Sequence, residues 1–200
     1  MERHSVGWFA AQRSLTGPAV ALFARRGEGI AQDPLNRQLL FLQPVIGYRY
    51  HSEAIVSADT PTLAQEDIDL LDPLELKGLP GTRIPHLWLE RQGQRISTLD
   101  LLDGRFVLFA GPHGAAWCEA ARALARRGAS DLAAYGIGPG ADLPDVENAW
   151  ETKMGVSSEG AVLVRPDGFV AWRAHTRASD AESVLEQAFS QMLCWPPAAV

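Results

Sequence analysis

The residue with the clearest chemical potential is Cys118, which lies near the start of a predicted helix, directly after an apolar run. A thiol at a helix N-terminus has a lowered pKa, and its thiolate is a nucleophile, so a single-cysteine thiol enzyme is one hypothesis. A Cys-x-x-Cys pair would need a second cysteine at position 121, where the sequence has Ala121. Without a resolving thiol, disulfide exchange cannot be completed within the chain. The sequence therefore favours Cys118 as a small packed residue.

The remaining polar candidates lack the spacing that catalysis or metal binding needs. Cys194, beside Trp195-Pro-Pro197, is interpreted as a tail residue. We expect structural or solvated roles for all five histidines, because none has metal-ligand spacing. They are His4, His51, His86, His113 and His175. The run Gly136-Ile-Gly-Pro-Gly140 resembles a phosphate loop, but the residues after it do not open a helix with free N–H groups, so we predict a flexible loop.

No side chain of this chain is therefore assigned a catalytic, cofactor-binding or metal-binding role. Charged side chains around the motif Pro166-Asp-Gly168 are expected to be solvated or salt-bridged, namely Arg165, Asp167 and Arg173. Tryptophans within predicted elements are expected to be packing anchors rather than a binding cage, namely Trp88, Trp117 and Trp172.

The elements that must position these residues begin with a predicted hairpin, in which residues 86–89 and 95–98 flank a turn at Gln92-Gly93. The apolar run 106–110 is typical of a strand buried on both faces. A helix over 115–127, closed by Gly128, and a strand over 132–137 follow. Strand, helix and strand in this order predict a βαβ unit with parallel strands.

The end of the chain predicts a second hairpin and a final helix. Residues 161–165 and 170–173 surround the Pro-Asp-Gly turn. The helix over about 180–193 carries one apolar stripe, and Ser179 with Glu182 matches a capping box. The stripe is Ala181, Val184, Leu185, Ala188, Phe189, Met192 and Leu193. With a short helix near Trp150, the order βαβ-α-ββα indicates an α/β, thioredoxin-like domain.

Charge and proline content divide the chain into three parts. Residues 1–57 carry a net charge of +2 and read as a helical or extended appendage that packs on the rest or docks on another molecule. Residues 58–80 carry six acids and one lysine, with prolines, and predict an acidic connector. Residues 81–200 form the thioredoxin-like domain. The acidic total of -6 argues against nucleic acid, and the absence of any long apolar run argues against membrane and signal segments. We expect a cytoplasmic protein.

Several stretches of this sequence match one known family. Pro80-Gly-Thr-Arg-Ile-Pro-His-Leu-Trp-Leu89, Gly104-Arg-Phe-Val-Leu-Phe109 and the closing hairpin 160–173 resemble the C-terminal region of class A flavin-dependent aromatic hydroxylases, of the phenol hydroxylase and polyketide hydroxylase type. Gly47-Tyr-Arg-Tyr50 resembles the last stretch of their FAD domain. The resemblance thus spans most of this chain but only the final portion of such an enzyme.

The resemblance implies an oxidoreductase, a monooxygenase that uses FAD and NAD(P)H to hydroxylate aromatic rings. It also implies a thioredoxin-like region without paired redox cysteines. No Gly-x-Gly-x-x-Gly motif occurs here, so we expect this chain to bind no cofactor and perform no hydroxylation alone. The partner implied is an FAD-domain polypeptide. The alternative is a non-catalytic module for homodimerisation or partner docking.

Overall fold

The computed structural model describes residues 47–49, 52, 54–56, 77–128 and 131–193, all within one compact unit of the chain. This part of the chain is a mixed α/β unit. In chain order its elements are β1 (Trp88–Arg91), β2 (Gln94–Ser97), the 3-10 helix η2 (Thr98–Leu101), β3 (Phe106–Ala110), α3 (Ala115–Arg126), β4 (Leu132–Gly136), α4 (Trp150–Met154), β5 (Ala161–Val164), β6 (Val170–Ala174) and α5 (Ala181–Met192).

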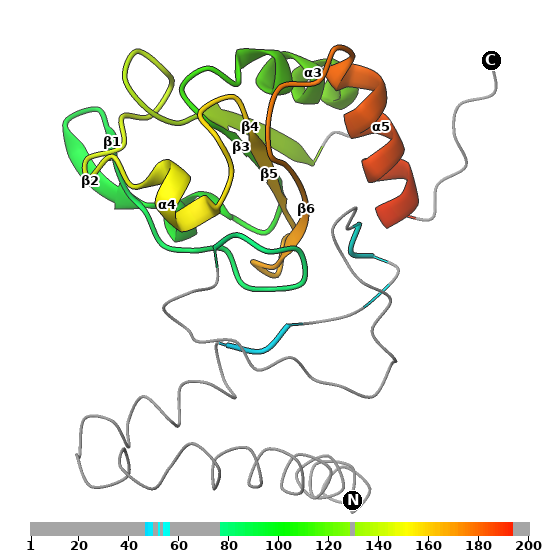
Figure 1. The fold of residues 1–200 in the computed structure, drawn as a ribbon, viewed down its shortest axis with the longest axis horizontal. Coiled ribbons are helices and arrows are strands. Elements are labelled where there is room, and N and C mark those ends of the chain that lie inside the picture. Colours follow the sequence, from blue (N-terminus) through cyan, green and yellow to red (C-terminus); the bar gives the residue numbers. More distant parts are fainter. Residues whose placement is uncertain (1–46, 50–51, 53, 57–76, 129–130, 194–200) are drawn as a thin grey trace, which may run out of the picture. The chain divides into compact units, whose positions relative to one another are not determined.

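Four of these strands form a mixed sheet in the order β4-β3-β5-β6 (Figure 1). β3 pairs in parallel with β4 and antiparallel with β5, and β5 pairs antiparallel with β6. The crossover between the parallel strands is α3, as a parallel pair requires. These pairings confirm the predicted βαβ unit and the predicted hairpin around the Pro-Asp-Gly turn.

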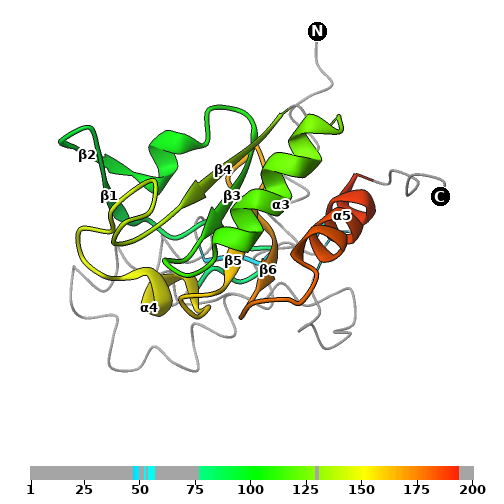
Figure 2. The same cartoon turned by 90° about the horizontal axis from the view of Figure 1, so that it is seen from above.

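Helices α3 and α5 cover one face of the sheet, while the β1–β2 hairpin and α4 lie over the other (Figures 1 and 2). Along β3, Leu108 and Ala110 join the core under α3 and α5, whereas Val107 and Phe109 join the core on the opposite side. Successive strand residues point to opposite faces, so one apolar run serves both cores. This explains why the β3 sequence shows no polar alternation.

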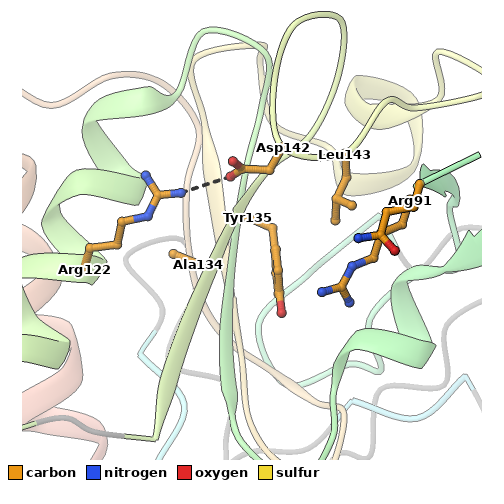
Figure 3. Close-up of a pocket in the computed structure, with 7 residues that line it drawn as sticks. Arg91, Arg122, Ala134, Tyr135, Asp142 and Leu143 are labelled. Atoms are coloured by element: carbon orange, nitrogen blue, oxygen red, sulfur yellow. Dashed lines mark hydrogen bonds and ion pairs between the residues drawn. The ribbon is translucent and has the colours of Figure 1, made fainter.

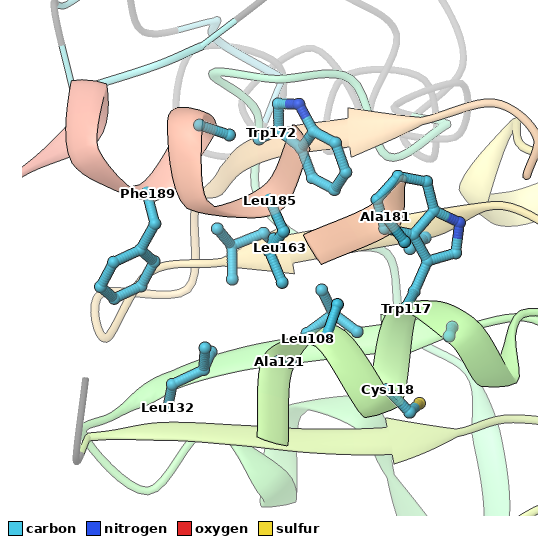
Figure 4. Close-up of a cluster of buried hydrophobic side chains, with 14 of the residues drawn as sticks. Leu108, Trp117, Cys118, Ala121, Leu132, Leu163, Trp172, Ala181, Leu185 and Phe189 are labelled. Carbon is cyan, nitrogen blue, oxygen red and sulfur yellow. The ribbon is translucent and has the colours of Figure 1, made fainter. Parts of the chain in front are cut away.

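The first core is anchored by a pair of tryptophans from α3 and β6 (Figure 4). The rings of Trp117 and Trp172 meet edge to face with centroids 5.3 Å apart. Trp117 also donates its indole N–H to the carbonyl of Glu159 at 3.0 Å, so its one polar atom is satisfied. Both residues therefore act as packing anchors, in the way the sequence predicts.

Both hairpins turn where the sequence places the turn. Gln92 and Gly93 have φ values of 55° and 76°. A two-residue turn of type I′ needs positive φ at both positions, which only glycine adopts without cost. The structure thus confirms the first hairpin, with Trp88 opposite Ser97.

The final helix differs from its prediction in its cap and in part of its stripe. The cap of α5 is Asp180, whose carboxylate accepts the Ser183 N–H at 3.0 Å, so the predicted capping box at Ser179 is wrong. Aspartate accepts backbone N–H groups at a helix start as well as serine does. Val184 and Leu193 are each 39% exposed and lie outside the core, because the apolar face of α5 is narrower than the predicted stripe.

A described segment from the N-terminal part of the chain packs on the sheet unit. Val56 donates its backbone N–H to the Ala171 carbonyl in β6 at 2.7 Å. The Tyr48 ring lies 5.5 Å from that of Phe169, and Arg49 Nε donates to the Pro80 carbonyl at 3.0 Å. Of the two readings of the appendage, packing on the rest of the chain therefore holds for these residues. The predictions for residues 1–46 and for 57–76 lie outside the described residues.

The described helices include none with the length and apolar character needed to cross a bilayer.

Candidate functional site

The Cys118 thiol is buried rather than presented at a helix start. Cys118 is the fourth residue of α3, 3% exposed, and belongs to the core between α3 and the sheet (Figure 4). Burial raises the pKa of the Cys118 thiol to about 11, although the nearby Arg122 opposes the shift. The effect of the helix N-terminus that the thiol-enzyme hypothesis needs is thus outweighed by desolvation. At neutral pH the thiol is protonated and is not a nucleophile. Cys194 lies outside the described residues.

His86 has a partner that the sequence analysis missed. Its Nδ1 lies 2.6 Å from the Ser97 hydroxyl, and its ring meets Trp88 edge-on at 4.4 Å. The signal was present in the predicted hairpin, since Trp88 pairs with Ser97 and His86 lies two residues before Trp88. A histidine that contacts a serine hydroxyl can act as the base that activates a serine nucleophile, so this pair resembles a catalytic arrangement.

The surroundings of Ser97 indicate a structural role for this pair. The Ser97 hydroxyl accepts the Leu99 N–H at 3.1 Å as the cap of η2, and Asp100 accepts the Ser97 N–H at 2.8 Å. Ser97 is also buried. A hydroxyl that caps a helix and faces no open space cannot reach a substrate carbonyl.

The other sequence candidates are held in structural contacts or stand apart. His113 and His175 lie in loops and are held by backbone hydrogen bonds. The backbone N–H of His113 donates to the Ser158 carbonyl, and the backbone carbonyl of His175 accepts the Ser157 N–H, both at 2.9 Å. Within the described ranges no three metal-ligating side chains come together. His4 and His51 lie outside these ranges.

The Pro166-Asp-Gly168 turn and the loop 136–140 are both held by hydrogen bonds and ion pairs within the fold. Arg165 pairs with Asp167 at 2.8 Å beside the Pro-Asp-Gly turn, and Arg173 donates to the Lys77 carbonyl at 3.0 Å. In the loop 136–140, the N–H groups of Ile137 and Gly138 donate to Ala110 and Leu143. Its first amide, that of Gly136, donates to the Asp142 carboxylate at 2.9 Å. These amides are unavailable to a phosphate, and the next helix, α4, starts only at Trp150.

One site on the described residues is an open cleft of about 410 Å³ along the outer edge of β4 (Figure 3). The residues that line it are Arg91, Gln92, Arg122, Ala134, Tyr135, Asp142 and Leu143. Figure 3 shows Arg122, from α3, on one side of β4 and Arg91, from the β1–β2 hairpin, on the other. Sequence reasoning did not find this cleft, because its residues come from four separate segments and share no motif.

The charges of this cleft suit binding better than catalysis. Arg122 pairs with Asp142 at 3.0 Å, and the same Asp142 oxygen accepts the Gly136 N–H. The Tyr135 ring stacks on Phe109 at 6.2 Å, which fixes its position on the strand. Guanidinium groups recognise carboxylates and phosphates, but neither they nor a salt-bridged aspartate form a nucleophile–base pair.

Comparisons with known proteins give a consistent result. Residues 77–196 match the family model described as "Aromatic-ring hydroxylase, C-terminal". The chain is 39% identical over 193 residues to tetracenomycin B2 monooxygenase-dioxygenase of Streptomyces olivaceus, covering 96% of this chain and 33% of that protein. It is 40% identical over 149 residues to 4-methyl-5-nitrocatechol 5-monooxygenase of a Burkholderia species, covering 74% and 27%. The chain thus spans about a third of the length of these relatives or less.

Solved structures agree with these relatives. Aklavinone-11 hydroxylase, solved with FAD and aklavinone, superposes with a TM-score of 0.68 and 37% identity, over 77% of this chain and 28% of that one. The flavin-dependent monooxygenase PieE, solved with FAD and substrate, gives a TM-score of 0.63 and 39% identity, over 76% and 26%.

Proposed function

Because this chain belongs to the family of aromatic-ring hydroxylase C-terminal regions, we propose that it forms the C-terminal portion of an FAD-dependent aromatic-ring monooxygenase. The observation that carries the proposal is the family match over residues 77–196, which includes every strand and helix described above. The identity of 39% along 96% of the chain supports it. The substrate would be an aromatic ring, as the names of the relatives indicate.

We assign a thioredoxin-like fold to the region 81–200. Two features support this assignment: the element order βαβ-α-ββα from β3 to α5 and the sheet order β4-β3-β5-β6. The β1–β2 hairpin precedes this core as an addition. The other proposed parts are the appendage 1–57, which resembles the end of an FAD domain, and the acidic connector 58–80.

The described side chains do not fit FAD. A pyrophosphate needs free amides at a helix N-terminus, and in the loop 136–140 the amides of Gly136, Ile137 and Gly138 are already hydrogen-bonded within the fold. We therefore assign no step of the hydroxylation to the residues of this chain, and we propose that the flavin site lies in a polypeptide or domain outside it. FAD, reduced by NAD(P)H, would supply the oxygen activation there.

The first test is a spectrum of the purified chain. We expect the chain to be colourless after incubation with FAD and gel filtration, and to leave NADPH unoxidised. A stoichiometric yellow flavin that remains with the chain would contradict the proposal.

The second test is reconstitution with the FAD-containing portion of a relative. Aklavinone-11 hydroxylase, which was solved with FAD, provides that portion when it is truncated before the region that matches this chain. We expect added chain to raise its substrate-dependent NADPH oxidation, measured against the same amount of an unrelated protein.

The alternative function is a non-catalytic module for homodimerisation or partner docking. It predicts unchanged NADPH oxidation in the reconstitution, together with a dimer or a stable complex by sedimentation. The observation that supports this alternative is the open cleft beside β4, a surface that another polypeptide could bind.

A further inference from the structure

We propose that the outer edge of β4, with the cleft beside it, binds an extended acidic peptide of a partner polypeptide. The site combines unpaired strand backbone with two arginines, and no residue of it takes part in the function proposed above. An added strand would pair with the backbone of β4, and its acidic side chains would enter the cleft.

The backbone of β4 leaves one side open. β4 is an edge strand, and its odd-numbered residues bond to β3: Phe106 donates to the Asp131 carbonyl and Ile137 donates to the Ala110 carbonyl. In a parallel ladder, alternate residues use their N–H and C=O groups on one side only. The N–H and C=O groups of Leu132 and Ala134 therefore point away from the sheet, and no described residue pairs with them.

The open stretch has a defined end. At Gly136 the outward N–H donates to the Asp142 carboxylate, and the outward carbonyl accepts the Leu143 N–H at 3.0 Å. The loop 138–143 thus covers the C-terminal end of β4, as proteins commonly do to protect a sheet edge. An added strand would lie along Leu132–Ala134, beside the cleft.

The charge of the cleft selects an acidic occupant. Arg122 is paired with Asp142 (Figure 3), but among the described residues no carboxylate forms an ion pair with Arg91. Two guanidinium groups and one carboxylate leave an excess of positive charge. A second copy of this chain would present another β4, Leu-Ala-Ala-Tyr-Gly, which holds no acid to pair with Arg91. A partner strand with glutamate or aspartate side chains satisfies both the backbone and Arg91.

The test is fluorescence anisotropy with the full chain and a fluorescein-labelled peptide that alternates glutamate and valine. We expect saturable binding by this peptide and much weaker binding by the matched peptide with lysine in place of glutamate. A third peptide, N-methylated at every backbone nitrogen, lacks the strand donors and should also lose binding. In a ¹⁵N-labelled chain, the amides of Leu132 and Ala134 should shift as the acidic peptide is added.

A pair of variants separates the cleft from the general charge of the surface. Arg91→Gln should weaken binding by about 1.5- to fivefold, the range for one exposed ion pair. The control Arg95→Gln removes an equal charge from the same hairpin, where Arg95 pairs with Glu147, and should leave binding unchanged.

Several results would overturn the proposal: absence of binding at millimolar peptide, equal binding by the lysine or N-methylated peptide, or equal effects of the two variants. Self-association of the chain through the β4 edge, seen by sedimentation and unaltered by Arg91→Gln, would identify a second copy as the occupant instead.

Discussion

Burial holds the Cys118 thiol in its neutral form, and alkylation can measure this. In a Cys194→Ser background, iodoacetamide should react with Cys118 slowly at neutral pH, and the rate should rise only as the pH approaches about 11. At pH 8 a pKa of about 11 leaves roughly one thiol in a thousand ionised. The measurement is the alkylation rate by mass spectrometry from pH 6 to 11. A midpoint at or below that of free cysteine would restore the thiol-enzyme hypothesis.

The same shift couples folding stability to alkaline pH. The pKa of the Cys118 thiol is higher in the folded chain than in the unfolded chain, so the neutral thiol contributes to the free energy of unfolding. This contribution is fully present below the pKa of the unfolded chain and is lost as the pH rises toward about 11. Urea unfolding should show a loss of about 1 kcal/mol between pH 8 and 10 that is absent in Cys118→Ala. Identical slopes in the two proteins would contradict the burial of the thiol.

At this scale, sequence reasoning placed candidate residues but could not see their surroundings. The alanine at position 121 rules out a Cys-x-x-Cys pair, and the structure adds that Cys118 itself is buried. The contact of Ser97 with His86 was missed although the register of the predicted hairpin brings the two residues close, because the sequence analysis weighed each residue separately. The cleft arginines Arg91 and Arg122 are brought together only by the tertiary fold.

At the scale of the element, α5 offers a direct comparison of the predicted and observed caps. Asp180→Ala should lower the melting temperature, because Asp180 accepts hydrogen bonds from both the N–H and the hydroxyl of Ser183. These hydrogen bonds lower the pKa of Asp180 in the folded chain. The stability that the Asp180 carboxylate adds is therefore present at pH values above the usual aspartate pKa and is lost as the pH falls below that pKa.

The matched control is Ser179→Ala, which removes the residue that the sequence pattern selected. Its melting temperature at neutral pH should equal that of the unchanged chain. A larger loss in Ser179→Ala than in Asp180→Ala would show that the pattern was right and the observed cap wrong.

Elements with a strong periodic or turn signal were predictable, and their ends were less so. The run 106–110 is typical of a doubly buried strand, and Gln92-Gly93 predicts a hairpin whose turn uses the glycine; the structure shows both. The start of α5 was ambiguous in the sequence, since serine and aspartate side chains can both accept backbone N–H groups at a helix start. Val184 lay on the apolar stripe by spacing, yet its burial depends on how far the sheet extends beneath the helix.

At the scale of the whole molecule, the described residues 47–49, 52 and 54–56 are part of the folded unit, and the contact of Tyr48 with Phe169, just before β6, can be measured. A double-mutant cycle of Tyr48→Leu and Phe169→Leu removes the ring contact at 5.5 Å while keeping apolar volume. We expect a coupling free energy of about 0.5–1.5 kcal/mol by urea unfolding, the range for aromatic pairs. Additive effects within error would show that the segment does not pack on Phe169 in solution.

The order of elements predicted the α/β arrangement, and the resemblance predicted the family. Neither indicated which part of the N-terminal stretch packs on the sheet, because a hydrogen bond from Val56 to Ala171 leaves no trace in composition or periodicity.

β3 lies between β4 and β5, and its pairing with β5 joins residues that are far apart in the sequence, which affects the rate of folding. The β1–β2 hairpin closes over two residues, whereas Val107 of β3 meets Val164, 57 positions further along the chain. Bringing such distant residues together costs chain entropy before any contact compensates for it. We therefore expect both hairpins to form early and the docking of the β5–β6 hairpin onto β3 to be the slow step of folding.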